Sequence, residues 1–386
     1  MMITSRERVS RTLEGKSTDQ VPVNFSGIVV GPPERKSEGA PYGVLALYEY
    51  LGIDDYDQPV PDPDSGIVIN IDKRVLARLG SDIRYVYTSM RLPEVLPDGS
   101  TRDMYGIVTP PDGNKIVSPD SRAPLRAATT VDDIKNYPYW PDPADPNFSI
   151  GIPEYIRTVR ETTDCALLLN APVVSTIFHK YAALRGFNNW LLDMRKNEKL
   201  YFALTETITE TAIETLRNVL PSIGTNVDII YYGDDMGMQS QPFMSPEMYR
   251  KYVKPYTKRW VHEVKKLLPH VKVFYHTCGS VYDLIPDFIE CGIDILDPLQ
   301  PLAYKMEPWR LRKEFGGRIC FHGGIDIQRL INFGTPPEIK NRVKEILAIF
   351  EGCPYILSTA HVVETDAPPE NLVAVYDAAA EYARNE

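Results

Sequence analysis

An imidazole and a thiol lie close together in the segment VKVFYHTCGSVYDLI, residues 271–285. A single residue separates His276 from Cys278, so on an extended strand both side chains point to the same face. Imidazole nitrogen and thiolate sulfur both bind zinc, and a catalytic zinc typically has three protein ligands and one open position. The pair therefore indicates half of a metal site or, alternatively, a packed thiol beside a hydrogen-bonded imidazole. His361, in YILSTAHVVETDAPPEN, offers the third ligand.

Short apolar runs that end in polar or turn residues are the elements that must position these side chains. Between the later runs lie segments typical of helices, at 246–268, 281–290, 308–316, 336–350 and 369–384. Alternation of buried strands with helices predicts a parallel sheet covered on its outside. Eight strands favour an α/β fold of the (β/α)8 TIM-barrel type, with a doubly wound open sheet as the alternative. The runs are 21–27, 83–89, 166–172, 228–234, 271–277, 293–298, 318–324 and 355–361.

Polar residues at the predicted strand ends are further candidates, because barrel enzymes take their catalytic groups from the carboxyl ends of several strands. Adjacent carboxylates on a strand point to opposite faces, so at most one of Asp234 and Asp235 faces the pocket. We assign Asp235 and His322 to catalysis, and Asn170, Asp234 and Gln300 to substrate binding. The structural alternatives are helix capping, a loop salt bridge or a hydrogen bond to the backbone. Other polar residues at these ends are Asn24, Ser26 and Asp297.

Composition restricts the class of protein. The chain of 386 residues has a formal net charge of -10, which disfavours nucleic acid and anionic membranes as partners. No apolar run approaches the length of a membrane span. The five cysteines are irregularly spaced, which favours location in a reducing cytoplasm. We expect one barrel domain over 1–386. The long segments 28–81 and 90–165, rich in Pro, Gly, Asp and Tyr, are expected to be loops that follow the first two strands.

Several longer segments resemble the uroporphyrinogen decarboxylase superfamily. They are RERVSRTLEGKSTDQVPV, GDDMGMQSQPFMSPEMYRKYVKPYTKRW, FYHTCGSVYDLIPDFIECGIDILDPLQP, FHGGIDIQRLINFGTPPEIKNRV and YILSTAHVVETDAPPENLVAVYDAA. The resemblance implies a (β/α)8 barrel and one of two chemistries. Cofactor-free decarboxylases of this superfamily carry an Arg-rich stretch after the first strand, whereas this chain has FSGIVVGPPERKSEGAPYG there, with only Arg35 and Lys36 as candidate cations.

The other branch is that of the zinc-dependent methyltransferases of corrinoid systems, which use His-x-Cys after the fifth strand and a Cys after the eighth. Here the last position is His361, so the resemblance implies zinc held by His276, Cys278 and His361. Glu364 offers a fourth ligand in the resting state, with capping of the nearby turn as the favoured alternative. A ligand set with one thiolate donates less charge and makes zinc a stronger Lewis acid. That difference favours cleavage of a methyl ether over methylation of a thiol.

The resulting hypothesis is methyl transfer from a small O-methylated compound, such as a methoxylated aromatic, to a corrinoid. A partner corrinoid protein supplies the cobalamin-type cofactor, because the chain lacks the DxHxxG loop that corrinoid proteins use. Transfer from methylcobalamin to a thiol is the first alternative. A porphyrinogen decarboxylase and a non-enzymatic tetrapyrrole carrier are less favoured, and the sequence leaves a homodimer open.

Overall fold

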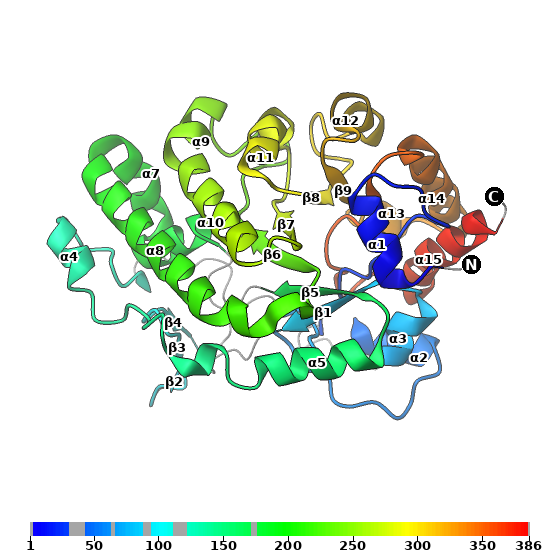
Figure 1. Ribbon diagram of the computed structural model, residues 1–386, viewed down its shortest axis with the longest axis horizontal. Helices are drawn as coiled ribbons and strands as arrows, with labels where there is room; N and C mark the ends of the chain where they lie inside the picture. The colour runs from blue at the N-terminus through cyan, green and yellow to red at the C-terminus, as the bar shows by residue number, and fades with distance from the viewer. Residues whose placement is uncertain are drawn as a thin grey trace.

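The main sheet is parallel throughout, and its strand order follows the order of the chain (Figure 1). The computed structural model describes residues 3–30, 43–62, 66–87, 94–110, 122–170 and 176–384. In these ranges seven strands form the sheet, in the order β1-β5-β6-β7-β8-β9-β10. A doubly wound sheet would reverse its strand order partway, so that alternative is wrong. The strands are β1 (Ile83–Tyr87), β5 (Ala166–Asn170), β6 (Ile229–Gly233), β7 (Lys272–His276), β8 (Ile295–Leu299), β9 (Cys320–Ile325) and β10 (Tyr355–Thr359).

The first predicted strand, 21–27, lies between the two edges of this sheet. Val23 forms a parallel bridge with Leu357 of β10, and its carbonyl accepts a hydrogen bond from the amide of Asp82, just before β1. The segment is not a regular strand. Some of its amide hydrogens bind side chains just before β1 instead of the backbone carbonyls of a neighbouring strand. The amide of Val23 donates to Asp82 Oδ2 at 2.9 Å, and the amide of Phe25 donates to Ser81 Oγ at 3.1 Å. The fold is therefore a TIM-type α/β barrel whose eighth position is held by a bridge and these hydrogen bonds.

Helices cover the outside of the sheet (Figure 1). Within the described chain, no helix is long and apolar enough to cross a membrane. The predicted helices from residue 281 onward are confirmed, with small shifts at their ends. The α-helices are α1 (Ser5–Leu13), α2 (Val44–Tyr50), α3 (Lys73–Arg78), α4 (Val131–Lys135), α5 (Ile152–Thr162), α6 (Phe178–Arg185), α7 (Phe187–Lys196), α8 (Glu198–Ile223), α9 (Pro246–Tyr252), α10 (Lys254–Leu267), α11 (Ile285–Cys291), α12 (Pro308–Phe315), α13 (Leu330–Phe333), α14 (Pro336–Phe350) and α15 (Pro369–Ala383).

The two long segments after the first strands carry small elements of their own. Segment 28–81 contains α2 and α3, and segment 90–165 contains α4, α5 and an antiparallel sheet of β2 (Glu94–Val95), β3 (Thr101–Arg102) and β4 (Val108–Thr109). Short 3₁₀ turns complete the described elements: η3 (Pro146–Phe148), η4 (Gly224–Asn226) and η5 (Tyr282–Leu284). Arg35 and Lys36 lie outside the described residues, so the structure does not place the only cations available there for a decarboxylase site.

The prediction of one helix over 246–268 is wrong in one respect. The helix is interrupted at Val253, where φ is -119° and ψ is -54°, and it restarts as α10. Pro255 is the cause, because proline has no amide hydrogen and its ring clashes with the carbonyl four residues earlier in a continuous helix. At the start of α10 the same proline is well placed, since its fixed φ suits the first turn.

The apolar core has two parts, inside the barrel and between sheet and helices. Phe274 faces inward and packs with the first inward residues of the other strands, whereas Val273 and Tyr275 belong to the outer cluster against the helices. Tyr275 therefore faces outward, against the helices. Val9 of α1 joins the inner cluster, so α1 closes the end of the barrel at which the strands begin. The opposite end stays open for polar side chains.

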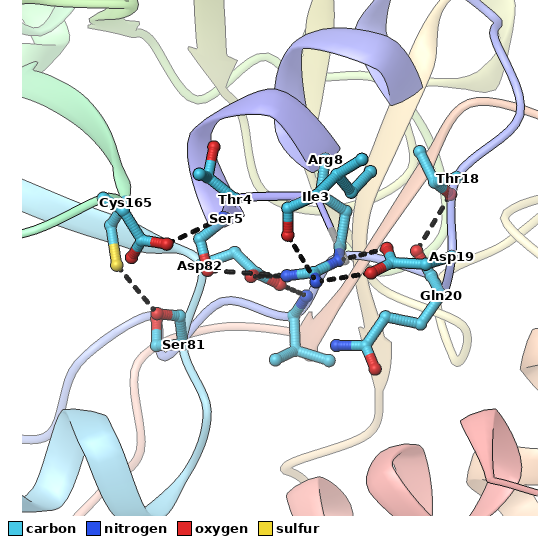
Figure 2. Close-up of polar contacts among 12 residues, drawn as sticks. Ile3, Thr4, Ser5, Arg8, Thr18, Asp19, Gln20, Ser81, Asp82 and Cys165 are labelled. Atoms are coloured by element: carbon cyan, nitrogen blue, oxygen red, sulfur yellow. Dashed lines mark hydrogen bonds and ion pairs between the residues drawn. The ribbon is translucent and has the colours of Figure 1, made fainter. Parts of the chain in front are cut away.

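A buried ion-pair network attaches α1 to the barrel (Figure 2). Arg8 binds Asp82 through Nη1 at 2.5 Å, and binds Asp19 through Nε at 2.8 Å and Nη2 at 2.9 Å. The Asp82 side chain is only 1% exposed and also accepts the amide of Val23. Because the same carboxylate contacts α1 and the first strand segment, the network links α1 to the closure of the ring.

Arg8→Lys is expected to lower the free energy of unfolding by about 2 kcal/mol. A lysine keeps the charge but cannot contact two carboxylates through a rigid fork, and a hydrogen bond between charged groups is worth about 1.5–3 kcal/mol. Urea denaturation followed by circular dichroism measures the change. The control is Arg11→Lys in the same helix, whose exposed pair with Glu7 should contribute less than about 0.5 kcal/mol. Equal midpoints for the two variants would contradict the argument.

Candidate metal centre

The three predicted metal ligands lie together at the open end of the barrel. His276 is the last residue of β7, Cys278 follows directly in the next turn, and His361 lies just beyond the end of β10. One ligand atom of each lies within 4.8 Å of those of the other two, and all three side chains are partly buried. Since β8 and β9 separate β7 from β10 in the sheet, the cluster exists only when the sheet is curled.

The turn after β7 fixes the position of Cys278. Gly279 has a φ of +84°, and a Cβ there would lie 2.5 Å from the carbonyl carbon of Gly237, so only glycine lets the two loops pack. The Cys278 amide donates to Asp235 Oδ1 at 2.8 Å, and the Gly279 amide donates to Gln300 Oε1 at 2.6 Å. Two side chains from neighbouring strands therefore hold the backbone on which the thiol is carried.

Asp297 of β8 holds the imidazole of His276. Its Oδ2 lies 2.6 Å from His276 Nδ1, and its Oδ1 lies 2.5 Å from His322 Nδ1. Burial opposes ionisation of Asp297, but the imidazoles of His322 and His276 lower its pKa below the usual range. An ionised carboxylate only accepts hydrogen bonds, so both Nδ1 atoms donate to it. In the neutral form of His276 the ring proton is then on Nδ1, and Nε2 presents the lone pair that a metal ligand requires. In the protonated form, Nε2–H donates to the Cys278 thiolate instead.

The electrostatic surroundings favour the thiolate form of Cys278. Burial by itself raises the pKa of this thiol, but hydrogen bonds with the imidazoles of His276 and His361 lower it below its ordinary value. His276 Nε2 lies 3.5 Å from Cys278 Sγ. The thiolate is the form that binds metal. Two imidazoles and one thiolate at this spacing are a donor set that fits a zinc ion.

The adjacent carboxylates Asp234 and Asp235 point to opposite faces of β6, as predicted. Asp234 is fully buried, and both of its oxygens accept hydrogen bonds from backbone amides at the start of α6, including those of Phe178 and His179. Asp235 faces the mouth, where its Oδ1 lies 3.9 Å from His276 Nε2. The geometry of Asp234 is that of a helix cap, and its assignment to substrate binding stays a prediction. Of the two, only Asp235 lies beside the proposed metal ligands.

The other predicted site residues occupy different depths. Asn170 ends β5 at the mouth, half-buried and paired in register with Tyr87. His322 lies deeper with no exposed surface, and its Nε2 is 2.9 Å from Asn24 Nδ2. Both ring nitrogens of His322 are thus engaged, an arrangement suited to supporting Asp297. Glu364 is exposed and is not part of the cluster found among the described residues.

Two neighbours of the cluster were not singled out from the sequence. His179 Nε2 lies 3.8 Å from Asp235 Oδ2, and the Tyr231 ring stacks on that of His276 with centroids 6.0 Å apart. The alternation of side chains along β6 could have predicted that Tyr231 lies at the site, because it places this residue on the same face as Asp235. His179 gave no such signal, since it reaches the site from the first turn of α6.

A parallel α/β barrel with a His-Cys-His cluster at the carboxyl ends of its strands has the architecture of a barrel enzyme whose active site lies at the mouth. Comparison with known families agrees with this class. The family model for uroporphyrinogen decarboxylase (URO-D) matches residues 114–382, and the chain belongs to this family.

Individual relatives include proteins with different names. A uroporphyrinogen decarboxylase of Trichodesmium erythraeum is 30% identical over 138 residues, 36% of this chain and 37% of the relative. A methylated-thiol--coenzyme M methyltransferase of Methanosarcina mazei is 31% identical over 136 residues, 35% of this chain and 33% of the relative. These matches span about a third of the relatives' own length. Among solved structures, a methyltransferase from Methanosarcina mazei has a TM-score of 0.64 and 18% identity, covering 98% of this chain and 99% of that chain, which shows the shared fold.

Proposed function

We propose that this protein is a zinc-dependent methyltransferase that moves a methyl group from a small O-methylated compound to the cobalt of a corrinoid protein. The observation that carries the proposal is the cluster of His276, Cys278 and His361 at the barrel mouth. The resemblance of 31% over part of the chain to a methyltransferase of Methanosarcina mazei supports the reaction class. A methoxylated aromatic is the donor that best suits a barrel mouth where the ring of Tyr231 lies beside the cluster.

In this proposal His276, Cys278 and His361 would hold a zinc ion, which would supply a Lewis acid for the oxygen that loses the methyl group. Asp297 orients His276, and Gln300 and Asp235 fix the turn that carries Cys278. Asp235 is also the carboxylate next to the cluster that faces the mouth, so it is the residue placed to orient a bound substrate. The corrinoid comes from a partner protein, which approaches the open end of the barrel.

Methyl transfer to a thiol is the second candidate function. The observation in its favour is the name of the Methanosarcina mazei relative, a methylated-thiol--coenzyme M methyltransferase. The ligand set argues the other way, because the imidazole of His361 adds no negative charge to the site, whereas a second thiolate would. Ligands with less negative charge leave a bound zinc ion a stronger Lewis acid, which favours departure of an oxygen anion from an ether.

Metal analysis combined with a panel of methyl donors tests the proposal. We expect about one zinc per chain. We also expect the absorption spectrum of methylcobalt to form when Co(I) cobalamin is mixed with the protein and a methoxylated aromatic. Formation from methylated thiols alone would favour the second candidate. Full activity in zinc-free protein would refute the metal assignment.

His361→Cys separates the two candidates. The variant keeps three ligands and should keep about one zinc per chain, but a second thiolate makes the site less electrophilic. We expect methyl transfer from ethers to slow by about tenfold, equivalent to about 1.4 kcal/mol in the barrier. The rate of methylcobalt formation measures the change. A faster reaction with ethers would contradict the argument from ligand charge.

A further inference from the structure

The side chain of Tyr231 lies beside the cluster on the inner face of the barrel. Its ring packs on Phe274 and His276, the successive inward residues of β7, with centroid distances of 5.9 and 6.0 Å and interplanar angles of 26° and 29°. Tyr231 also belongs to the partly buried residues that pack on the inner core. The ring is therefore fixed between the apolar interior and the metal-ligating imidazole.

Gly233 lets the hydroxyl of Tyr231 reach the level of the cluster. It is the next inward position on β6 and pairs in register with His276. A Cβ at Gly233 would lie 2.8 Å from the Tyr231 hydroxyl oxygen and 3.2 Å from the Cβ of His276. A larger side chain at this position would displace the phenol, so the glycine keeps the hydroxyl next to His276.

The hydroxyl of Tyr231 is available to a ligand. Among the described residues it has no hydrogen-bond partner, and its side chain is only partly buried. Nearby tyrosines differ in this respect: the hydroxyl of Tyr85 accepts from Asn24, and that of Tyr232 donates to Asp234. A tyrosine in a protein interior usually has a partner for its hydroxyl. At the barrel mouth, an unpaired hydroxyl is suited to a substrate atom that accepts a hydrogen bond.

We propose that Tyr231 donates a hydrogen bond to the oxygen atom of the methyl donor from which the methyl group departs. The inference rests on the proposed function. In the transfer, the C–O bond breaks and its electron pair stays on the oxygen, while the Co(I) corrinoid supplies the electron pair of the new C–Co bond. The phenol of Tyr231 keeps its proton. Its hydrogen bond strengthens as negative charge develops on the oxygen, so it stabilises the transition state more than the bound ether.

The same contact selects for oxygen donors. Ether and phenolate oxygens accept hydrogen bonds well, whereas a thioether sulfur is a weak acceptor. Removal of the hydroxyl should therefore slow transfer from an ether much more than transfer from a methylated thiol. A purely structural role of Tyr231 would lower both rates alike.

Tyr231→Phe tests the inference. We expect kcat with a methoxylated aromatic and Co(I) cobalamin to fall about 100-fold with little change in KM, the loss typical of removing one donor to a developing oxyanion. The dissociation constant of para-nitrophenolate, a stand-in for the demethylated product, should rise about tenfold, because one charge-assisted hydrogen bond is lost. Its visible absorbance allows a direct titration. Zinc content should equal that of the unchanged protein.

The matched control is Tyr249→Phe. Tyr249 lies on α9 outside the barrel, is fully buried and packs on Phe288, so this variant removes a hydroxyl on the outer side of the sheet and should bind para-nitrophenolate normally. Equal binding by Tyr231→Phe and the unchanged protein would overturn the inference, as would an equal loss of activity with ethers and methylated thiols. Failure of the unchanged protein to demethylate any methoxylated compound would overturn the proposed function instead, and the titration would then decide the role of Tyr231 alone.

Discussion

Cys278→Ala is expected to remove nearly all bound zinc from the purified protein. Structural zinc sites with four ligands have binding free energies of about 10–16 kcal/mol, so the loss of one ligand costs on the order of 3–4 kcal/mol, or about 100- to 1000-fold in affinity. Cys278 is the only thiol of the cluster and is poised as a thiolate, so no neighbouring group replaces its charge. Competition with a chromophoric chelator measures the affinity, and elemental analysis measures the stoichiometry.

Cys353→Ala provides the control for this experiment. Cys353 is also a free, partly buried cysteine, but its Sγ lies near Gly316 at the end of α12, away from the mouth. We expect this variant to retain the zinc affinity of the unchanged protein. If Cys278→Ala also retains it, the cluster is not the zinc site, and the imidazole and thiol are then a packed pair.

The sequence predicted the cluster because its geometry depends on local rules. Alternation along a strand places His276 and Cys278 on one face, and the carboxyl ends of parallel strands meet at one end of a barrel, which brings His361 to them. The same rule predicted that Asp234 and Asp235 diverge. It did not predict which of them faces the mouth, because that depends on where α6 presents its free backbone amides to β6.

The parts that the sequence did not predict depend on register and on competing partners. Asp297 bridges His276 and His322 because β7, β8 and β9 align these residues, and the pairing of β8 with β9 is irregular between Leu296 and Leu299. Pro298 signals an interruption there, because proline has no amide hydrogen for the ladder, but it does not specify which residues the shift brings into line. Likewise, the segment around Val23 has the composition of a strand, but the side chains of Ser81 and Asp82 take the amide hydrogens that a ladder would use.

Asp297→Asn is expected to weaken zinc binding about 10- to 100-fold, although residue 297 is not itself a ligand. Two imidazole Nδ1–H groups donate to this carboxylate, at 2.6 and 2.5 Å. An amide offers one acceptor oxygen, and its NH₂ group would face the second N–H. Either His276 loses the partner that directs Nε2 to the metal, or His322 is left with an unpaired buried donor. The chelator competition used for Cys278→Ala measures the change in affinity.

Asp294→Asn is the control for Asp297→Asn, because Asp294 lies at the opposite end of β8. Asp294 precedes β8, pairs with Lys265 and accepts the amide of Val273, far from the mouth. Asp294→Asn should lower the stability of the fold with no change in zinc affinity. Asp297→Asn should lower the zinc affinity even when its metal-free form is folded. An unchanged affinity in folded Asp297→Asn would mean that the packing of β7 alone orients His276. A loss of affinity confined to Asp297→Asn would make this carboxylate, with His322 behind it, the support that holds the imidazole in its metal-binding form.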